Sequence, residues 1–164
     1  MKRILLLLAV LVLSAAVSGP LKAQAMMQAN PYVGTWKLNL EKSKITGVPA
    51  PKSLTREVVA DGAGAKYTYK GTAADGKAID YSFATNYDCK DGAISGSGAP
   101  GGADALSIKR ISANKTEAIV KRDGKEIGKS AAEVSKDGKI TTIRGSGKTP
   151  DGKAYSYVLV FETQ

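Results

Sequence analysis

The feature that most constrains this chain is a turn signal that returns at regular intervals. Asp-Gly occurs six times after residue 60, at Asp61, Asp75, Asp91, Asp123, Asp137 and Asp151. Aspartate tolerates left-handed backbone and bonds to nearby amides, and glycine adopts positive φ freely, so the pair is typical of tight hairpin turns. Four of the five intervals are 14 to 16 residues long, which fits one long or two short strands between turns. Asn114-Lys115 marks a further turn.

Between these turns the side chains alternate as they do in half-buried strands. The segments 79–87 and 153–162 show this best, with apolar or aromatic residues at every second position. No segment of a dozen residues after residue 25 shows the apolar stripe of a helix. The pattern predicts strands at 33–40, 53–60, 65–72, 77–87, 93–97, 104–112, 115–122, 126–135, 139–147 and 153–162. Short strands in this order predict an all-β fold, an antiparallel up-and-down β-barrel of about 8–10 strands.

Two stretches lack the alternation of a strand, and two segments of the chain are similar to each other. Residues 41–52 contain Gly47, Pro49 and Pro51 and are expected to be a connection, while the glycine-rich residues 96–103 are expected to be a flexible loop. Shifting residues 57–85 onto 133–161 aligns ten identities in 29 positions without a gap. Recurrent turn chemistry explains part of this match, and an ancient duplication would explain all of it.

The first 25 residues have the pattern of an export signal. Lys2 and Arg3 precede an apolar run from Ile4 to Leu13, and Ala23-Gln24-Ala25 is a small-x-small cleavage site. The run is shorter than the roughly 20 residues of a spanning helix, so no transmembrane anchor is expected. These features predict a signal peptide at 1–25 with cleavage after Ala25, a single domain at 26–164, and a secreted or periplasmic location.

Composition excludes several kinds of chemistry. The chain has no histidine and one cysteine, Cys89, so Ser-His and Cys-His nucleophiles, thiolate metal sites and an intrachain disulfide are all excluded. After removal of residues 1–25, 21 basic and 15 acidic residues remain, a net charge of +6. The lysines are scattered, which fits a solvated surface and not a nucleic-acid interface. We expect no metal, no cofactor and no enzymatic activity.

The first predicted strand carries Gly34-Thr35-Trp36, and the last ends in Val160-Phe161-Glu162. This pattern resembles the lipocalin and fatty-acid-binding superfamily of barrels, and the opening around it is similar to that of secreted bacterial proteins without an assigned activity. The resemblance implies a barrel with the tryptophan closing one end. The chain departs from fatty-acid-binding proteins because it has no room for their two-helix lid and no ligand-binding cation on the last strand. Arg144, on the preceding strand, is the expected substitute for the basic residue that lipocalins pack against the tryptophan.

The candidate ligand-binding residues are the inward positions of the predicted barrel. Trp36, Leu38 and Leu40 share one face of the first strand, and further strands contribute the rest of the candidate interior: Tyr69, Tyr81, Phe83, Arg144 and Tyr157. These aromatic side chains either fill the barrel completely or line a pocket.

Two functions remain open from the sequence. One is a barrel that binds a small apolar or amphipathic molecule. The other is a protein-interaction module with an envelope partner, such as an inhibitor of an extracellular protease.

Overall fold

The computed structural model describes residues 30–164, so the predicted signal peptide lies outside the described residues. The chain forms antiparallel strands joined by short turns, with one 3₁₀ turn at Pro100–Gly102. The strands are β1 (Gly34–Thr46), β2 (Ser53–Asp61), β3 (Gly64–Thr72), β4 (Ala78–Thr85), β5 (Asp88–Ala93), β6 (Ser95–Ser97), β7 (Ala105–Ser112), β8 (Lys115–Arg122), β9 (Lys125–Val134), β10 (Ile140–Lys148) and β11 (Ala154–Thr163). The prediction of an all-β antiparallel barrel is confirmed. No helix within residues 30–164 has the length and apolar character needed to cross a bilayer.

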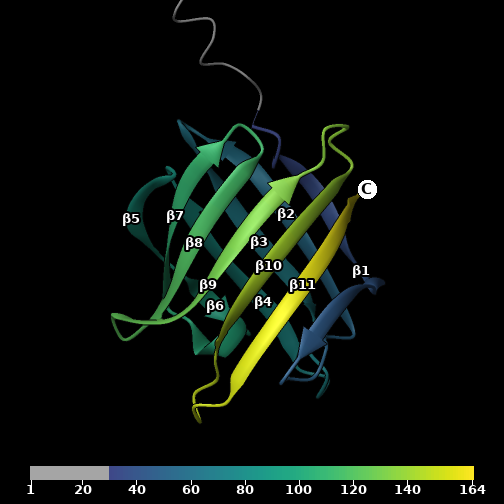
Figure 1. Ribbon diagram of the computed structural model, residues 1–164, viewed down its shortest axis with the longest axis vertical. Coiled ribbons are helices and arrows are strands. Elements are labelled where there is room, and N and C mark those ends of the chain that lie inside the picture. Colours follow the sequence, from purple (N-terminus) through teal and green to yellow (C-terminus); the bar gives the residue numbers. More distant parts are fainter. Residues whose placement is uncertain (1–29) are drawn as a thin grey trace, which may run out of the picture.

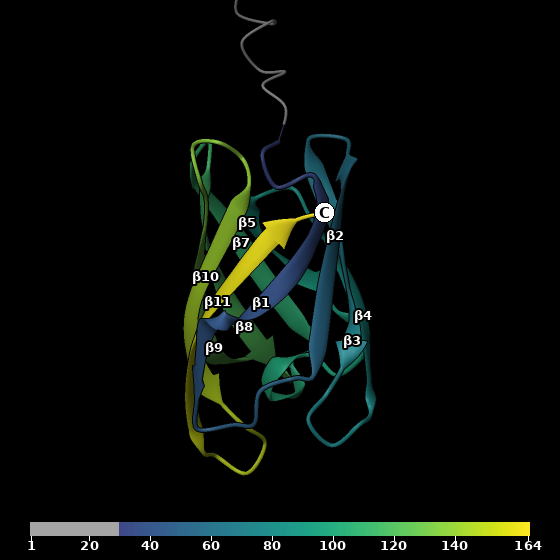
Figure 2. The same cartoon turned by 90° about the vertical axis from the view of Figure 1, so that its right-hand side faces the viewer.

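The strands form one continuous sheet that curls into a flattened barrel. Its order is β5-β7-β8-β9-β10-β11-β1-β2-β3-β4-β6, so chain neighbours are sheet neighbours almost throughout. β7 to β11 lie side by side in front of β2, β3 and β4 in Figure 1, and Figure 2 shows these groups as two walls with β1 crossing between them. The space between the walls holds the core and the candidate site.

The barrel closes through one extended segment that changes partners. β5 pairs with β7 through Asp91 and Ser107, whereas β6, which begins two residues after β5 ends, pairs with β4 through Tyr81 and Gly96. The same segment therefore joins both edges of the sheet. The Asp-Gly turn predicted at residues 91–92 was wrong, because these residues lie inside β5. A side chain at Gly92 would collide with the β4 carbonyl oxygen of Ala84, so this glycine allows a close approach of strands.

The other five Asp-Gly pairs form the turns that the sequence predicts. They lie at the β2–β3, β3–β4, β8–β9, β9–β10 and β10–β11 connections. Asp123 and Gly124 alone separate β8 from β9, and both have positive φ, 52° and 70°, as a two-residue hairpin turn requires. The predicted turn at Asn114 joins β7 to β8. Local turn chemistry thus fixes most of the strand order.

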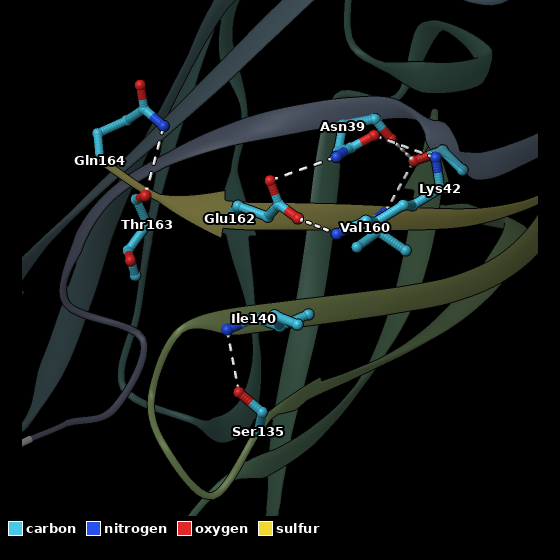
Figure 3. Close-up of polar contacts among 9 residues, drawn as sticks. Asn39, Lys42, Ser135, Ile140, Val160, Glu162, Thr163 and Gln164 are labelled. Atoms are coloured by element: carbon cyan, nitrogen blue, oxygen red, sulfur yellow. Dashed lines mark hydrogen bonds and ion pairs between the residues drawn. The ribbon is translucent and has the colours of Figure 1, made fainter.

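β1 is longer than predicted because it continues through a bulge into residues 41–46. Asn39 pairs with Val160 and Lys44 pairs with Val158, so the four residues between them face a single residue of β11. The Ser43 hydroxyl donates to the Asn39 carbonyl oxygen (2.6 Å) and accepts from the Val160 amide (2.9 Å), which replaces the interrupted ladder. Figure 3 shows this bulge, with Glu162 bonded to the Asn39 and Lys42 side chains.

The bulge explains one wrong prediction. Leu40 was expected to point inward with Trp36 and Leu38, but it is 39% exposed. The extra residues of the bulge break the alternation of side chains after Asn39. Ile45 returns to the interior once the regular pairing with β11 resumes.

The two halves of the predicted repeat form similar hairpins. β3 pairs with β4 and β10 pairs with β11 in the same register, since Tyr69 pairs with Tyr81 and the positions 76 residues later, Gly145 and Tyr157, also pair. Their turns share two backbone hydrogen bonds and a Lys-to-Asp ion pair at equivalent positions. Structural equivalence therefore extends the sequence similarity over 64–85 and 140–161.

The fully buried side chains gather toward one end of the barrel. The Tyr32 hydroxyl shares its single proton between the carbonyl oxygens of Asn114 (2.9 Å) and Ala132 (2.8 Å), and Trp36 Nε1 donates to the Tyr32 carbonyl oxygen (2.9 Å). The segment before β1 thus crosses this end and closes it. Beneath it lie the other large, fully buried side chains of residues 30–164: Trp36, Arg56, Val58, Val134, Thr141 and Phe161.

Candidate functional site

The barrel encloses a cavity of about 300 Å³ between its two walls. Its lining is mostly aliphatic and aromatic, from β1, β2, β3, β4, β7, β8, β9, β10 and β11, and its charged lining residue within the described chain is Arg56. Pro49, Ala74 and Pro100 lie in three connecting segments at the end opposite Trp36, where the cavity reaches the surface. The interior is therefore a one-ended pocket with a closed floor and an open mouth.

Arg56 forms the floor of the pocket, at an inward position of β2 with 1% of its surface exposed. Its cross-strand neighbours are Trp36 on β1 and Tyr69 on β3. The guanidinium carbon lies 5.2 Å from the ring centre of Trp36 and 5.2 Å from that of Phe161, so two aromatic faces hold it. Its Nη2 donates to the Thr141 hydroxyl (3.0 Å).

The charge of Arg56 has no carboxylate partner among residues 30–164. Its Nε is the one buried side-chain polar atom in this part of the chain that lacks a hydrogen-bond partner. A buried cation without a counter-ion is unfavourable by several kcal/mol, and an unsatisfied buried donor adds about 1–3 kcal/mol. A ligand that brings a hydrogen-bond acceptor, preferably an anionic one, to the floor would therefore stabilise the buried guanidinium.

On the β3–β4 wall the aromatic rings stand in stacked pairs. Tyr69 and Tyr81 are cross-strand partners with ring centres 4.8 Å apart and an interplanar angle of 9°. Tyr67 and Phe83 form the next pair at 4.9 Å and 14°. A separation close to the distance between paired strands means that both rings of a pair project from the sheet side by side.

On the β10–β11 wall the rings lie differently. Tyr155 and Tyr157 belong to the same strand, and their ring centres are 6.1 Å apart. Their cross-strand partners on β10 are Gly147 and Gly145. A methyl group added at Gly145 would lie 2.5 Å from the Tyr157 Cζ, so this ring covers the neighbouring strand directly.

The segment 98–103 forms a strap over the mouth of the pocket. Gly98 lies beside Ile79 of β4, and Pro100 and Ala103 contribute to the lining. At its other side the Gly101 carbonyl oxygen accepts a hydrogen bond from Arg122 Nη1 (2.6 Å). Figure 2 shows the short coiled turn of this segment between the two walls. A side-chain latch from β8 therefore holds the strap in place.

Burial raises the pKa of the pocket tyrosines and keeps them neutral. Desolvation is the main cause for Tyr69, Tyr81 and Tyr157, and the pKa of Tyr157 rises to about 12. The positive charge of Arg56 opposes part of the rise of the Tyr69 pKa. The pocket therefore presents neutral phenols and one cation beside the hydroxyls of Thr116 and Ser130, which suits a ligand that supplies acceptors.

The structure brings most of the predicted interior residues together. Tyr69, Tyr81, Phe83 and Tyr157 line the pocket. Trp36 and Leu38 are buried, as predicted for inward positions, but they lie outside the lining. Whether any of these residues binds a ligand stays a prediction.

The inward position of Arg144 was a wrong prediction. Arg144 is exposed on the outer face of β10, opposite Ala131 of β9, because its neighbour Ile143 occupies the inward register position. Arg56, from β2, packs against the tryptophan instead. Its signal in the sequence is the alternation Leu54-x-Arg56-x-Val58, which places the arginine on the apolar face of the strand.

No group of three or more potential metal-ligating side chains occurs within residues 30–164. Cys89 is a free, exposed cysteine on β5.

No protein-family model and no curated protein matches this chain. Among solved structures, zebrafish ileal bile acid-binding protein complexed with cholic acid is similar at 11% identity, over 82% of this chain and 99% of that one, with a TM-score of 0.44. Lobster apocrustacyanin A1 is similar at 13% identity, over 87% of this chain and 66% of that one, with a TM-score of 0.46. A de novo designed fluorescence-activating β-barrel is similar at 14% identity, over 83% and 96% of the two chains, with a TM-score of 0.40.

Similarity at this level concerns the fold alone and identifies no ligand. The N-terminal motif of the resemblance is not tested by it.

Proposed function

We propose that this protein binds a small amphipathic molecule inside its barrel, with an anionic or acceptor group on Arg56 and an apolar body along the aromatic walls. The observation that carries the proposal is the unpaired guanidinium at the floor of an otherwise apolar pocket. Arginine presents several donors in a fixed planar fork that matches carboxylate, sulfonate and phosphate oxygens. One of those donors bonds to the Thr141 hydroxyl, and Nε has no hydrogen-bond partner in the described structure, so the guanidinium retains unused donor capacity.

The size and composition of the pocket support a compact ligand. A protein cavity of about 150 Å³ accommodates a benzene ring, and this pocket has about twice that volume, about 300 Å³. Drug-sized sites begin at about 300 Å³ and combine apolar walls with few, well-placed polar groups. This pocket has that combination, since its polar lining is Arg56, tyrosine hydroxyls, Thr116 and Ser130.

Binding suits this lining better than catalysis does. The lining within residues 30–164 contains neither a carboxylate nor a cysteine thiol, and general acid–base chemistry needs a group that titrates near the working pH. Export by the signal at 1–25 and the alternative of a protein-interaction module stay predictions from the sequence.

A matched pair of fluorescent probes tests the proposal. 1-Anilinonaphthalene-8-sulfonate and N-phenyl-1-naphthylamine share one aromatic skeleton, and the first carries a sulfonate. Wild-type protein should bind both probes saturably at one site, in competition with each other, and should prefer the sulfonate.

Two neighbouring substitutions locate the site. Ala132 lines the pocket, whereas Ala131 lies on the outer face of β9. Ala132→Phe should fill the pocket and abolish binding of both probes, while Ala131→Phe should leave binding unchanged. Equal effects of the two substitutions, with both variants folded, would place the probes outside the barrel and contradict the proposal.

A further inference from the structure

Two glycine–tyrosine pairs shape one wall of the pocket. Gly145 pairs with Tyr157 and Gly147 pairs with Tyr155 across β10 and β11. A methyl group at Gly145 would lie 2.5 Å from both the Cζ and the hydroxyl oxygen of Tyr157, and one at Gly147 would lie 2.7 Å from the Tyr155 hydroxyl oxygen. The end of each ring therefore rests directly on a glycine Cα.

Backbone conformation does not explain these glycines. Neither Gly145 nor Gly147 belongs to the positive-φ residues of the chain, so alanine would be compatible with the local backbone. The nearest obstacle to a side chain at each glycine is the tyrosine ring above it, and a β9 carbonyl oxygen, from Lys129 at 2.8 Å or Ile127 at 3.0 Å, lies slightly farther away. The tyrosine rings thus occupy the space where a Cβ would be.

The repeated hairpin provides an internal comparison. Tyr81 of β4 and Tyr157 of β11 lie at equivalent positions in hairpins of identical register, but the partner of Tyr81 is Tyr69, whereas the partner of Tyr157 is Gly145. Tyr81 cannot cover β3, because the Tyr69 ring stands there in a stack at 4.8 Å. Tyr157 faces no side chain at its paired position, Gly145, and its ring lies across β10 there. The partner on the adjacent strand thus decides whether a ring projects from the wall or covers it.

We propose that Gly145 and Gly147 determine which ligands fit, by keeping the rings of Tyr157 and Tyr155 flat against β10 and out of the pocket. This inference rests on the proposed function and adds a determinant of ligand size. Rings that only covered the glycines would stabilise the sheet without affecting ligand choice. Both tyrosines line the pocket, however, so the space that they leave empty is the space available to the ligand.

A side chain at Gly145 should turn the Tyr157 ring into the pocket. A series of alkanesulfonates from hexanesulfonate to tetradecanesulfonate, competing with 1-anilinonaphthalene-8-sulfonate, measures the longest chain that fits. Gly145→Ala should weaken the longest chains that bind wild-type protein by at least about tenfold, the effect of a small steric misfit in an apolar pocket, and should spare hexanesulfonate.

A double-mutant cycle separates this mechanism from general damage to β10. Tyr157→Ala should extend the accepted chain length, and Gly145→Ala should have little further effect in the Tyr157→Ala background. A methyl group at Gly145 would also lie 2.8 Å from the Lys129 carbonyl oxygen, so Gly147→Ala serves as a second test if Gly145→Ala does not fold. An unchanged length limit in Gly145→Ala and Gly147→Ala, or an equal loss with and without the Tyr157 ring, would overturn the inference.

A measurement without ligand distinguishes failure of this inference from failure of the proposed function. In wild-type protein the Tyr157 ring should shift the Gly145 Hα proton resonances upfield and give nuclear Overhauser contacts to them, and in Gly147→Ala these contacts should persist. Absence of probe binding with these contacts present would contradict the proposed function alone. Absence of the contacts would contradict the packing on which the inference depends.

Discussion

Replacing Arg56 by methionine should separate the stability of the barrel from its ligand preference. The substitution keeps an unbranched side chain of similar length and removes the charge. It removes two cation–π contacts at 5.2 Å and the hydrogen bond to Thr141 at 3.0 Å, and it also removes a buried, unpaired cation. The contacts are worth about 0.5–2 kcal/mol each, and the hydrogen bond about 1.5–3 kcal/mol.

Removing the Arg56 charge also removes the free-energy cost of burying that charge, which offsets these losses. Exchanging buried charges for apolar side chains of similar volume is often neutral or stabilising, so we expect Arg56→Met to change the free energy of unfolding by less than about 1 kcal/mol, or to raise it. The preference for the sulfonate probe over its neutral counterpart should fall about 10- to 100-fold, because a hydrogen bond to a charged group contributes about 1.5–3 kcal/mol.

Urea unfolding followed by Trp36 fluorescence gives the stability, and competitive titration of the two probes gives the preference. Arg144→Met is the matched control, since it removes the same charge from the outer face and should alter neither quantity. A loss of more than about 3 kcal/mol in the free energy of unfolding, with an unchanged probe preference, would show that Arg56 is a purely structural residue and does not bind the ligand.

Three further predictions concern pH, the strap and the bulge. Because burial raises the pKa of Tyr157 to about 12, the folded state retains a proton that the unfolded state releases near pH 10. The stability that this pKa shift contributes is therefore fully present below about pH 10 and is lost as pH rises toward 12. Urea unfolding with phenolate absorbance measures this, and phenolate formation by Tyr157 at pH 10 in fully folded protein would contradict it. Arg122→Ala removes the latch on Gly101 and should accelerate probe association and dissociation about tenfold or more with little change in Kd, as stopped-flow fluorescence would show; unchanged rates would mean that the strap does not limit entry. Ser43→Ala leaves the Val160 amide without its acceptor and should lower the free energy of unfolding by about 1–3 kcal/mol, with faster hydrogen exchange at that amide; an unchanged exchange rate would show that the hydroxyl does not maintain the bulge.

The positions of most strands could be predicted from the sequence because they depend on residues that are close together in the chain. The Asp-Gly turns and period-two alternation act within a few residues, and they predict most strands to within one or two positions. The prediction of a turn was wrong at Asp91-Gly92, where the glycine lies inside β5 and allows β4 to approach closely. The prediction of an inward side chain was wrong at Leu40, because a bulge is defined by the partner strand and leaves no turn signal.

The site was accessible only in part, because it depends on register between distant strands. Alternation identified the pocket aromatics, including Tyr69 and Tyr81. The alternation Leu54-x-Arg56-x-Val58 favoured an inward Arg56, but which arginine packs against Trp36 depends on the register between strands, which alternation alone does not give. The roles of Gly145 and Tyr157 follow from a cross-strand pairing, which a single strand does not reveal.

The proposed role of Arg56, whose guanidinium would receive the anionic end of a ligand inside the barrel, is tested most directly by nuclear magnetic resonance of protein with ¹⁵N-labelled arginine. The Arg56 Nε–H signal is observed during titration with decanesulfonate. We expect a proton that exchanges slowly with solvent and a signal that moves downfield in proportion to occupancy, with contacts from the alkyl chain to Tyr69 and Tyr81. A saturated complex with an unmoved Arg56 signal, and with ligand contacts confined to the outer face around Arg144, would contradict it.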